Sequence, residues 1–286
     1  MSAPQIAIVV PTRNRARYLD VALASLQDQE AAPESEIVVV DDGSSDDTRQ
    51  VAVAHGVRVV GHERALGLNA ARNTGVRAST ASLVAFVDDD VLAPPGWLRA
   101  LADGSRRHAE ADAFGGPIRA RLEGRAPRGC GGEKPPITTL DLGRRDRVAE
   151  VVWGANMAIR REALERVGPF DETIGGHGDE EDWLLRLRDS GGSIVYLAGA
   201  GLEHRRAGAD SRLRSLARAA YHRGRAARRS DQRRLRAPGL RIELRTLGGC
   251  VWHAVRRRCP QGLIMGAHAA GRIREALVRA PRSGTG

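Results

Sequence analysis

Short apolar runs alternate with helical segments over the first 115 residues, and this alternation constrains the fold more than any other feature of the chain. The runs Ile6–Val10, Ile37–Val40 and Leu83–Val87 are rich in β-branched residues, as is typical of buried strands. The segment between the first two runs places apolar residues at the spacing of one helix face: Leu19, Ala22, Leu23 and Leu26. Strands separated by helices in this way indicate βαβ units and an α/β fold, with a parallel sheet covered on both faces.

Charge divides the chain into an acidic part and a basic part. Residues 1–204 carry 24 Lys and Arg against 31 Asp and Glu, whereas residues 205–286 carry 21 Arg against four acidic residues. The basic part has a helical pattern with breaks near Pro238 and Pro260. We therefore predict an α/β domain over 1–204 and an Arg-rich helical region over 205–286. A region this basic is expected to attract an anionic partner: lipid headgroups, nucleic acid or a phosphorylated substrate.

Residues 115–150 differ from both parts, because they are rich in Gly, Pro and Arg and show no periodicity. We predict a mobile loop there rather than a strand or a helix. Order returns at 151–160, and 179–189 has the pattern of a helix.

Several protein classes are excluded or disfavoured. No apolar run approaches the ~18 residues that span a bilayer, and we expect no signal peptide because the first residues lack an apolar stretch with a cleavage site. The P-loop pattern GxxxxGK[ST] is absent from the sequence. The cysteines form no C-x-x-C pair, which argues against a disulfide framework and a cysteine zinc site and fits a reducing cytoplasm: Cys130, Cys250 and Cys259.

Polar residues follow the predicted strands at the points where they end. Pro11–Asn14 follows the first strand, Asp41–Ser45 the second, and Asp88–Asp90 the strand at 83–87. In open α/β sheets the ligand site lies beyond the carboxyl ends of the strands. Because side chains alternate along an extended segment, Asp88 and Asp90 point the same way and can share a hard cation such as Mg²⁺ or Mn²⁺. The alternative for these acids is a solvated turn.

Other candidates have a functional and a structural interpretation. Asp41 and Asp42 either form a strand-ending turn or accept hydrogen bonds from a base or a ribose. Arg72 either faces a pyrophosphate or nucleobase or is a solvated helix residue. The acids of 179–182 suit the first turn of a helix, yet one of them could serve as a general base. His204, a few residues past a strand that we predict at Ile194–Leu197, is either structural or a third metal ligand or phosphate contact.

Six segments, taken in order, resemble glycosyltransferase family 2. They are IAIVVPTRNRARYL, EIVVVDDGSSDDT, ALGLNAARNTGVRAS, LVAFVDDDV, WGANMAIRREALERVGPFDE and GDEEDWLLRLRDSGG, and they cover about residues 5–204. The resemblance implies the GT-A fold, a Rossmann-like mixed sheet flanked by helices, here with a basic helical extension. It also implies an inverting transferase that moves a sugar from a nucleotide-diphosphate sugar to an acceptor hydroxyl with the help of Mg²⁺ or Mn²⁺.

The resemblance assigns roles to individual residues. The expected donor-binding residues are Pro11, Thr12 and Arg13 in the nucleoside pocket, Asp42 alone or with Asp41 at the base, Arg72 near the nucleotide, and Asp89 at the ribose or sugar. The expected metal ligands are Asp88 and Asp90 of the DxD motif, with His204 as a third. The expected sugar and acceptor residues are Trp153, Gly154 and Asn156. Glu180 takes the position of the catalytic base, with Asp179, Glu181 and Asp182 as alternatives because the order of the acids departs from the family pattern.

Two other functions remain as alternatives. A nucleotidyltransferase would normally offer a basic, glycine-rich loop to a triphosphate, whereas PTRNR has no glycine. A basic protein that binds nucleic acid or a membrane surface would rely on 205–286, where we find no nucleic-acid motif. We expect this region to meet an anionic membrane or a lipid-linked acceptor, because Leu247–Ile273 mixes apolar residues with Arg256–Arg258 in the manner of an interfacial helix. A packed helical subdomain is the alternative. The expected location is the cytoplasm, with peripheral attachment at the inner face of the cell membrane.

Overall fold

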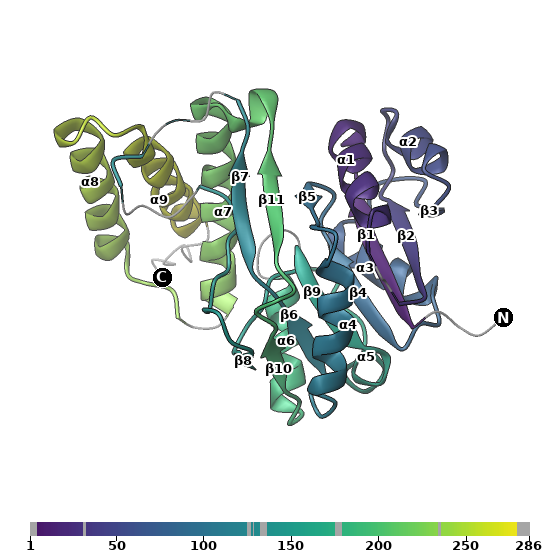
Figure 1. Ribbon diagram of the computed structural model, residues 1–286. Helices are drawn as coiled ribbons and strands as arrows, with labels where there is room; N and C mark the ends of the chain where they lie inside the picture. Colours follow the sequence, from purple (N-terminus) through teal and green to yellow (C-terminus); the bar gives the residue numbers. More distant parts are fainter. Residues whose placement is uncertain are drawn as a thin grey trace. The chain divides into compact units, whose positions relative to one another are not determined.

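The computed structural model describes residues 5–30, 33–124, 127, 129–131, 136–174, 179–233 and 236–278, without the side chain of Asp179 (Figure 1). The chain divides into two compact units. Within the described residues, unit 1 comprises 5–121, 138–174 and 179–205, and unit 2 comprises 122–137 and 206–278. The charge pattern predicted a domain boundary after residue 204, and the second stretch of unit 2 begins close to it, at residue 206. The stretch 122–137 was expected in the α/β domain and clusters instead with the helices of unit 2.

Unit 1 is built on a large mixed sheet. Its strand order is β3-β2-β1-β4-β9-β6-β10-β8. β1, β2, β3 and β4 run parallel, whereas β9 runs antiparallel to both of its neighbours, β4 and β6. The strands are β1 (Ile6–Thr12), β2 (Ser35–Asp41), β3 (Arg58–Gly61), β4 (Leu83–Val87), β6 (Ala113–Gly115), β8 (Arg147–Val148), β9 (Asn156–Arg160) and β10 (Ile194–Tyr196). The predicted α/β fold with a mixed sheet is confirmed.

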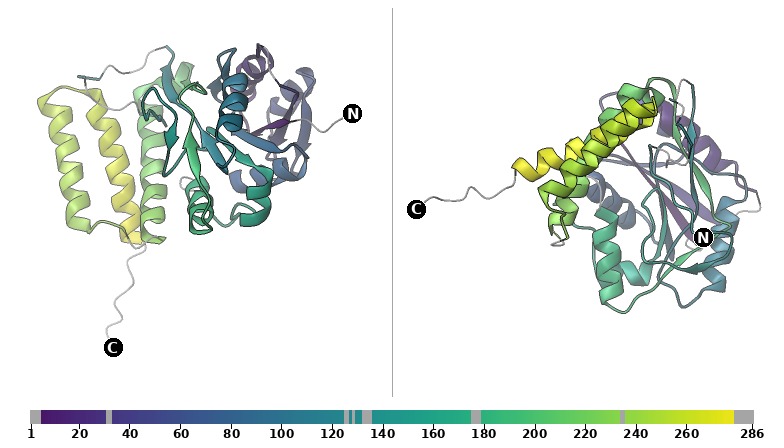
Figure 2. Two further views of the ribbon diagram at one scale, coloured as in Figure 1. Left: turned by 60° about the horizontal axis from the view of Figure 1, so that its bottom comes forward. Right: turned by 90° about the vertical axis from the view of Figure 1, so that its left-hand side faces the viewer.

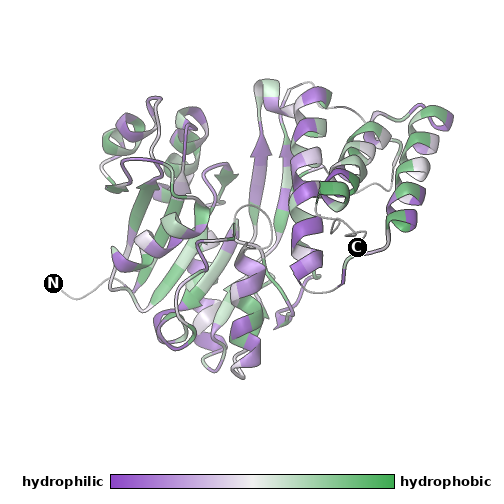
Figure 3. Cartoon of the chain, turned by 180° about the vertical axis from the view of Figure 1, so that it is seen from behind, coloured by the Kyte–Doolittle hydropathy of each residue, from purple (hydrophilic) through white to green (hydrophobic). Residues whose placement is uncertain are grey.

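Helices cover both faces of this sheet, because its strands are apolar on both sides (Figure 3). Along β1, Ile8 and Val10 pack in one core cluster and Val9 in the other. The first cluster includes residues of α1 (Ala16–Gln27), α2 (Thr48–Ala54) and α4 (Trp97–Arg107). The second includes residues of α3 (Leu68–Arg77), α5 (Arg161–Val167) and α6 (Asp179–Asp189). The alternating strand–helix pattern of the sequence therefore predicted this layered arrangement correctly.

A small second sheet has the order β5-β11-β7. Its strands are β5 (Val91–Leu92), β7 (Ile118–Leu122) and β11 (Leu202–Arg206). The prediction that 115–150 contains no strand is wrong, because β7 and β8 lie within it. In β7 the burial alternates from Ile118 to Leu122, the period-2 pattern of a strand, and the surrounding Gly and Pro residues obscured it in the sequence. Residues 125, 126, 128 and 132–135 of the predicted loop lie outside the described residues.

Unit 2 contains three long helices that lie side by side, α7 (Leu213–Arg233), α8 (Leu240–Arg256) and α9 (Pro260–Val278) (Figure 2). A 3₁₀ turn at Gly208–Ser211 precedes them. Glycines allow α7 and α9 to pack closely, since a Cβ on Gly224 would lie 2.0 Å from the carbonyl oxygen of His268. The stretch 247–273, predicted as one interfacial helix, is divided between α8 and α9. Among the described helices, none combines the length and apolar character that crossing a bilayer requires.

Part of the basic charge of unit 2 is neutralised inside the unit. Glu243 is 3% exposed and contacts Arg228 and Arg272 at 3.2 and 2.8 Å. Glu275 is equally buried and contacts Arg225 and Arg229 at 3.0 and 3.1 Å. Buried carboxylates require such partners, because an unpaired buried charge is strongly destabilising. Some of the arginines of unit 2 therefore neutralise carboxylates that are buried inside the unit.

Candidate active site

The strand register of unit 1 gathers the polar strand ends at one edge of the large sheet. Thr12 at the end of β1 pairs with Asp41 at the end of β2, and the Asp42 N–H donates to the Thr12 carbonyl at 2.9 Å. On the other side, Val87 at the end of β4 pairs with Asn156 at the start of β9. The strand order reverses between β1 and β4, and in α/β sheets ligands bind at such a switch point. The residues after β1, β2 and β4 therefore frame the candidate site.

Two of the three aspartates after β4, Asp89 and Asp90, are held by residues at and just after the end of β1. The Thr12 hydroxyl donates to Asp89 Oδ2 at 2.7 Å. The Arg15 guanidinium contacts both Asp89, at 2.9 Å, and Asp90. It also lies 4.4 Å from the centre of the Tyr18 ring, which fixes its position. The sequence analysis did not single out Arg15, because an arginine at the start of a predicted helix carries no signal of its own.

Burial and neighbouring charges alter the protonation of this group. Burial, followed by the charges of Asp90 and Asp88, raises the pKa of Asp89 to about 7, although Arg15 and the Thr12 hydroxyl act in the opposite direction. The pKa of Arg15 is raised, because the charges of Asp89 and Asp90 outweigh the effect of its burial. A site that concentrates carboxylates in this way favours a cation.

Asp88, Asp90 and His204 form a group with the composition of a divalent cation site. Each offers one ligand atom, and these atoms lie within 4.8 Å of one another. His204 is brought there by the small sheet, because it pairs with Val91 of β5, directly after Asp90. His204 Nε2 lies 3.0 Å from Asp90 Oδ1, and Nδ1 lies 3.2 Å from the carbonyl oxygen of Thr138.

The contact with Thr138 determines which nitrogen of His204 is available. A carbonyl only accepts hydrogen bonds, so Nδ1 donates its proton to Thr138, and Nε2 is the ring nitrogen that faces the Asp90 carboxylate. A carbonyl behind the ring is the usual partner of a metal-bound histidine. Two carboxylates and one imidazole suit Mn²⁺ or Mg²⁺. The residues therefore fit the predicted metal ligands.

Asp42 organises the loop that precedes α3. Its two carboxylate oxygens accept the backbone N–H groups of Leu66 and Gly67 at 2.8 and 2.9 Å, and the ring of His62 lies 2.7 Å away. Burial alone would raise the pKa of Asp42, but the hydrogen bonds from His62, Leu66 and Gly67 together hold it below its ordinary value. Asp41 accepts the Ser44 N–H at 3.0 Å, which is the strand-ending turn considered from the sequence. A contact of either residue with a base stays a prediction.

A second group joins three predicted residues from distant segments. Arg72 is 2% exposed, and its guanidinium lies 3.9 Å from Glu180 Oε2 and 3.2 Å from Asn69 Oδ1. The Gly154 N–H donates to Glu180 Oε1 at 3.4 Å. Gly154 packs directly under Arg72, because a Cβ at this position would lie 2.1 Å from the guanidinium. The structural interpretation of Arg72 as a solvated helix residue is therefore wrong.

The remaining acids of α6 differ in their surroundings. Asp182 lies 3.2 Å from Arg186 at the surface, an i,i+4 ion pair along the helix. Glu181 is half-buried. The side chain of Asp179, and the glycine-rich loop at 175–178 before it, lie outside the described residues. Among the described acids on α6, Glu180 contacts both Gly154 and Arg72, and its role as the base stays a prediction.

Other predicted site residues are placed as follows. Asn156 is 3% exposed, and its amide accepts from Trp97 Nε1 at 3.1 Å and donates to the Ala200 carbonyl at 2.8 Å, which is a structural role. Trp153 is half-buried against the first core cluster. Pro11 is buried at the end of β1, and Arg13 is exposed.

Comparisons with known proteins bear on the family of the chain. The sequence model of Glycosyl transferase family 2 matches residues 7–168. A pre-mycofactocin glycosyltransferase from Mycobacterium tuberculosis is 33% identical over 242 residues, which are 78% of this chain and 47% of that protein. A validoxylamine A glucosyltransferase from Streptomyces hygroscopicus is 31% identical over 62% of this chain and 46% of that protein. The chain thus spans about half the length of these curated relatives.

Solved structures share the fold. A mannosyltransferase from Pyrobaculum calidifontis, solved with GDP-Man and Mn²⁺, has a TM-score of 0.59 at 18% identity and covers 98% of this chain and 77% of its own. GalNAc-T7, solved with UDP, GalNAc and Mn²⁺, has a TM-score of 0.57 at 16% identity and covers 77% of this chain and 48% of its own. At these identities the likeness shows the fold alone.

Proposed function

The chain belongs to glycosyl transferase family 2, and from this we propose that it moves a sugar from a nucleotide-diphosphate sugar to an acceptor hydroxyl by an inverting single displacement. The observation that carries the proposal is the group formed by Asp88, Asp90 and His204 at the β1/β4 switch point, where three ligand atoms lie within 4.8 Å of one another. The relatives named for glycosyl and glucosyl transfer support the class of reaction.

Donor binding is assigned to the residues that frame the switch point. Asp88, Asp90 and His204 would hold Mn²⁺ or Mg²⁺, which when bound neutralises the charge of a departing nucleoside diphosphate. Thr12 and Arg15 keep Asp89 and Asp90 in place and so preorganise the site. Asp41, Asp42, Pro11 and Arg13 are proposed to line the nucleoside end, and Asp89 to face the ribose or sugar.

Glu180 is proposed as the general base. It would remove the proton from the acceptor hydroxyl, whose oxygen attacks the anomeric carbon opposite the leaving diphosphate, so that the configuration is inverted. The Arg72 guanidinium at 3.9 Å stabilises the negative charge of Glu180, which is the form that accepts a proton. The Gly154 N–H orients the same carboxylate, while Trp153 would border the acceptor side. Asp179, Glu181 and Asp182 remain the alternative bases.

The acceptor is proposed to be lipid-linked, with unit 2 resting on an anionic membrane surface. The described part of α8 and of the turn after it exposes large apolar side chains beside three consecutive arginines: Val251 at 54%, Trp252 at 58% and Val255 at 73%, next to Arg256–Arg258. Exposed apolar side chains flanked by arginines suit an interface between lipid and water. Co-sedimentation with vesicles tests this. We expect binding to anionic vesicles that W252A weakens, and equal, negligible binding to anionic and neutral vesicles would contradict it.

The reaction itself is tested by the product. Incubation with UDP-, GDP- and dTDP-sugars and Mn²⁺ or Mg²⁺, combined with thermal shift, should show one donor that raises the melting temperature. Turnover of that donor should release a nucleoside diphosphate. Release of pyrophosphate from a nucleoside triphosphate and a sugar phosphate would instead identify a nucleotidyltransferase and overturn the proposal.

A further inference from the structure

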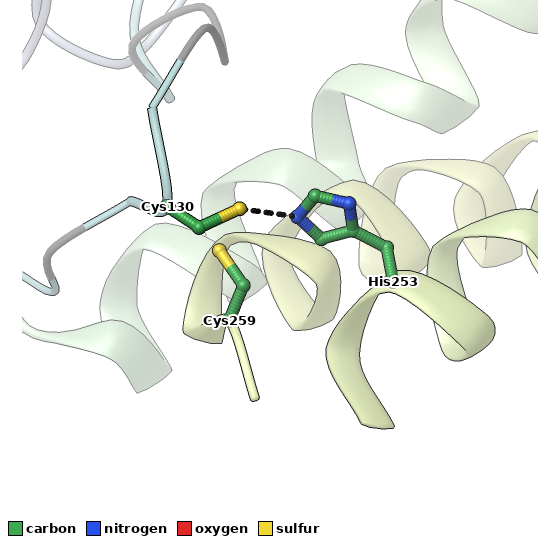
Figure 4. Close-up of side chains that lie close together, drawn as sticks. All are labelled: Cys130, His253 and Cys259. Carbon is green, nitrogen blue, oxygen red and sulfur yellow. Dashed lines mark hydrogen bonds between the residues drawn. The ribbon is translucent and has the colours of Figure 1, made fainter. Parts of the chain in front are cut away.

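Two cysteines and a histidine lie close together within unit 2. They form a group separate from Asp88, Asp90 and His204 of unit 1, with sulfur ligands in place of carboxylates. Cys130 lies in the segment that follows β7, His253 in the last turn of α8, and Cys259 directly before Pro260, the first residue of α9. Figure 4 shows the three side chains directed toward one another, with Cys130 Sγ 3.4 Å from His253 Nε2. Their three ligand atoms lie within 4.8 Å of one another. The odd number of cysteines and the lack of a C-x-x-C pair argued against a cysteine zinc site, and the spacing of these three residues in the sequence gave no indication of this group.

We propose that Cys130, His253 and Cys259 form a binding site for a zinc-type divalent metal ion. Zn²⁺ binds thiolate sulfur at about 2.3 Å and imidazole nitrogen at about 2.0–2.1 Å in a tetrahedral arrangement. Neighbouring sulfur and nitrogen ligands on such a tetrahedron are roughly 3.5 Å apart. The distance of 3.4 Å between Cys130 Sγ and His253 Nε2 matches this separation.

The charge balance also favours a divalent ion. Two thiolates and a neutral imidazole carry two negative charges, which one Zn²⁺ neutralises. Soft thiolate ligands prefer zinc to Mg²⁺ or Mn²⁺, whereas the carboxylates of unit 1 have the opposite preference. The chain would therefore bind two kinds of metal ion at two chemically distinct places.

The local backbone explains why His253 and Cys259 meet. The helix α8 ends at Arg256, and Arg258 adopts a left-handed conformation with φ of 48°. This turn reverses the chain, so that Cys259 returns toward the last turn of α8. Cys259 is 3% exposed, whereas Cys130 is exposed, which leaves a path for an ion from solvent.

A bound ion would link Cys130, in the stretch after β7, to the turn between α8 and α9. These stretches are more than a hundred residues apart in the sequence, since 123 positions separate Cys130 from His253. Metal binding that joins such distant segments stabilises the folded unit, because the site does not exist in the unfolded chain.

The experiment uses the full chain, reduced, loaded with Zn²⁺ and desalted. Elemental analysis should find one zinc per chain in the wild type. C130S should lose it, and because Cys130 is exposed this variant is expected to fold. H253A should lose the zinc as well. C250S is the matched control, because Cys250 lies on α8 outside the group, and it should retain the metal.

A second readout identifies the ligands independently. Loading with Co²⁺ should give the sulfur-to-metal charge-transfer band and the intense visible bands of a tetrahedral site in the wild type and C250S, and none in C130S. Retention of zinc by C130S and H253A, or absence of zinc and of these bands from the wild type, would overturn the proposal.

Discussion

The replacement of Gly154 by alanine tests how tightly the candidate base is positioned. The new Cβ would lie 2.1 Å from Arg72 Nη2 and 3.0 Å from its Cζ. Ordinary contacts begin near 3.4 Å, so the guanidinium must retreat by more than 1 Å. It has little room to do so, because Arg72 is 2% exposed and donates to Asn69. Overpacking of this kind typically costs about 1–3 kcal/mol of folding free energy.

The larger effect is expected on catalysis. Moving Arg72 weakens its contact with Glu180 and shifts the peptide N–H that orients the same carboxylate. A misplacement of about 1 Å in catalytic geometry can cost about 10²-fold in rate. We therefore expect G154A to fold with a lower melting temperature and to lose about two orders of magnitude in kcat.

The assay is sugar transfer under donor saturation, with circular dichroism and thermal unfolding to confirm the fold. The matched control is G199A, because a Cβ on Gly199 would meet its nearest neighbour, Ala100, at an ordinary 3.7 Å. It should retain nearly full activity and stability. A folded G154A variant with wild-type kcat would refute the proposed packing of Gly154, Arg72 and Glu180.

Three further outcomes are expected. E180Q should lower kcat by about 10²–10⁴-fold, whereas D182N, whose residue pairs with Arg186 at the surface, should stay near wild type; the reverse result would move the base to Asp182. H204Q should raise the Mn²⁺ concentration needed for half-maximal rate by at least about tenfold, and an unchanged requirement would remove His204 from the ligand set. The lowered pKa of Asp42 means that its ionised form stabilises the fold above its unfolded pKa, and that this stability is lost as the pH falls through the folded pKa. Thermal unfolding should therefore show the advantage of wild type over D42N shrinking below a pH of about 4, and a constant difference would contradict this.

Much of the architecture was predictable because it depends on local patterns. The runs Ile6–Val10 and Leu83–Val87 are too short and too rich in β-branched residues for helices, and both are strands of the large sheet. Acids placed directly after such runs must lie at the carboxyl edge, so Asp88 and Asp90 were correctly grouped. For these two aspartates, the position directly after a strand is sufficient to predict that they lie at the edge of the sheet.

Contacts between distant segments were not predictable in the same way. Arg15 has no local feature that separates it from a solvated arginine, and its role follows from the adjacency of β1 and β4. The group of Cys130, His253 and Cys259 depends on the turn after α8 and on a segment more than a hundred residues earlier. The antiparallel pairing of β9 with β4, which places Asn156 beside Val87 at the end of β4, likewise follows from tertiary packing.

The central claim is that Asp88 and Asp90 hold the ion that binds a sugar nucleotide's diphosphate. The most direct test is a Mn²⁺ titration followed by electron paramagnetic resonance, with UDP or GDP present, in a C130S background that removes the proposed thiolate site. The parent protein should bind one Mn²⁺ and bind its nucleotide more tightly when the ion is present, and D88N/D90N should lose both properties while remaining folded. If the double variant still bound Mn²⁺ and nucleotide with the parent's affinity, the ion would have to be held elsewhere and the proposed site would be wrong.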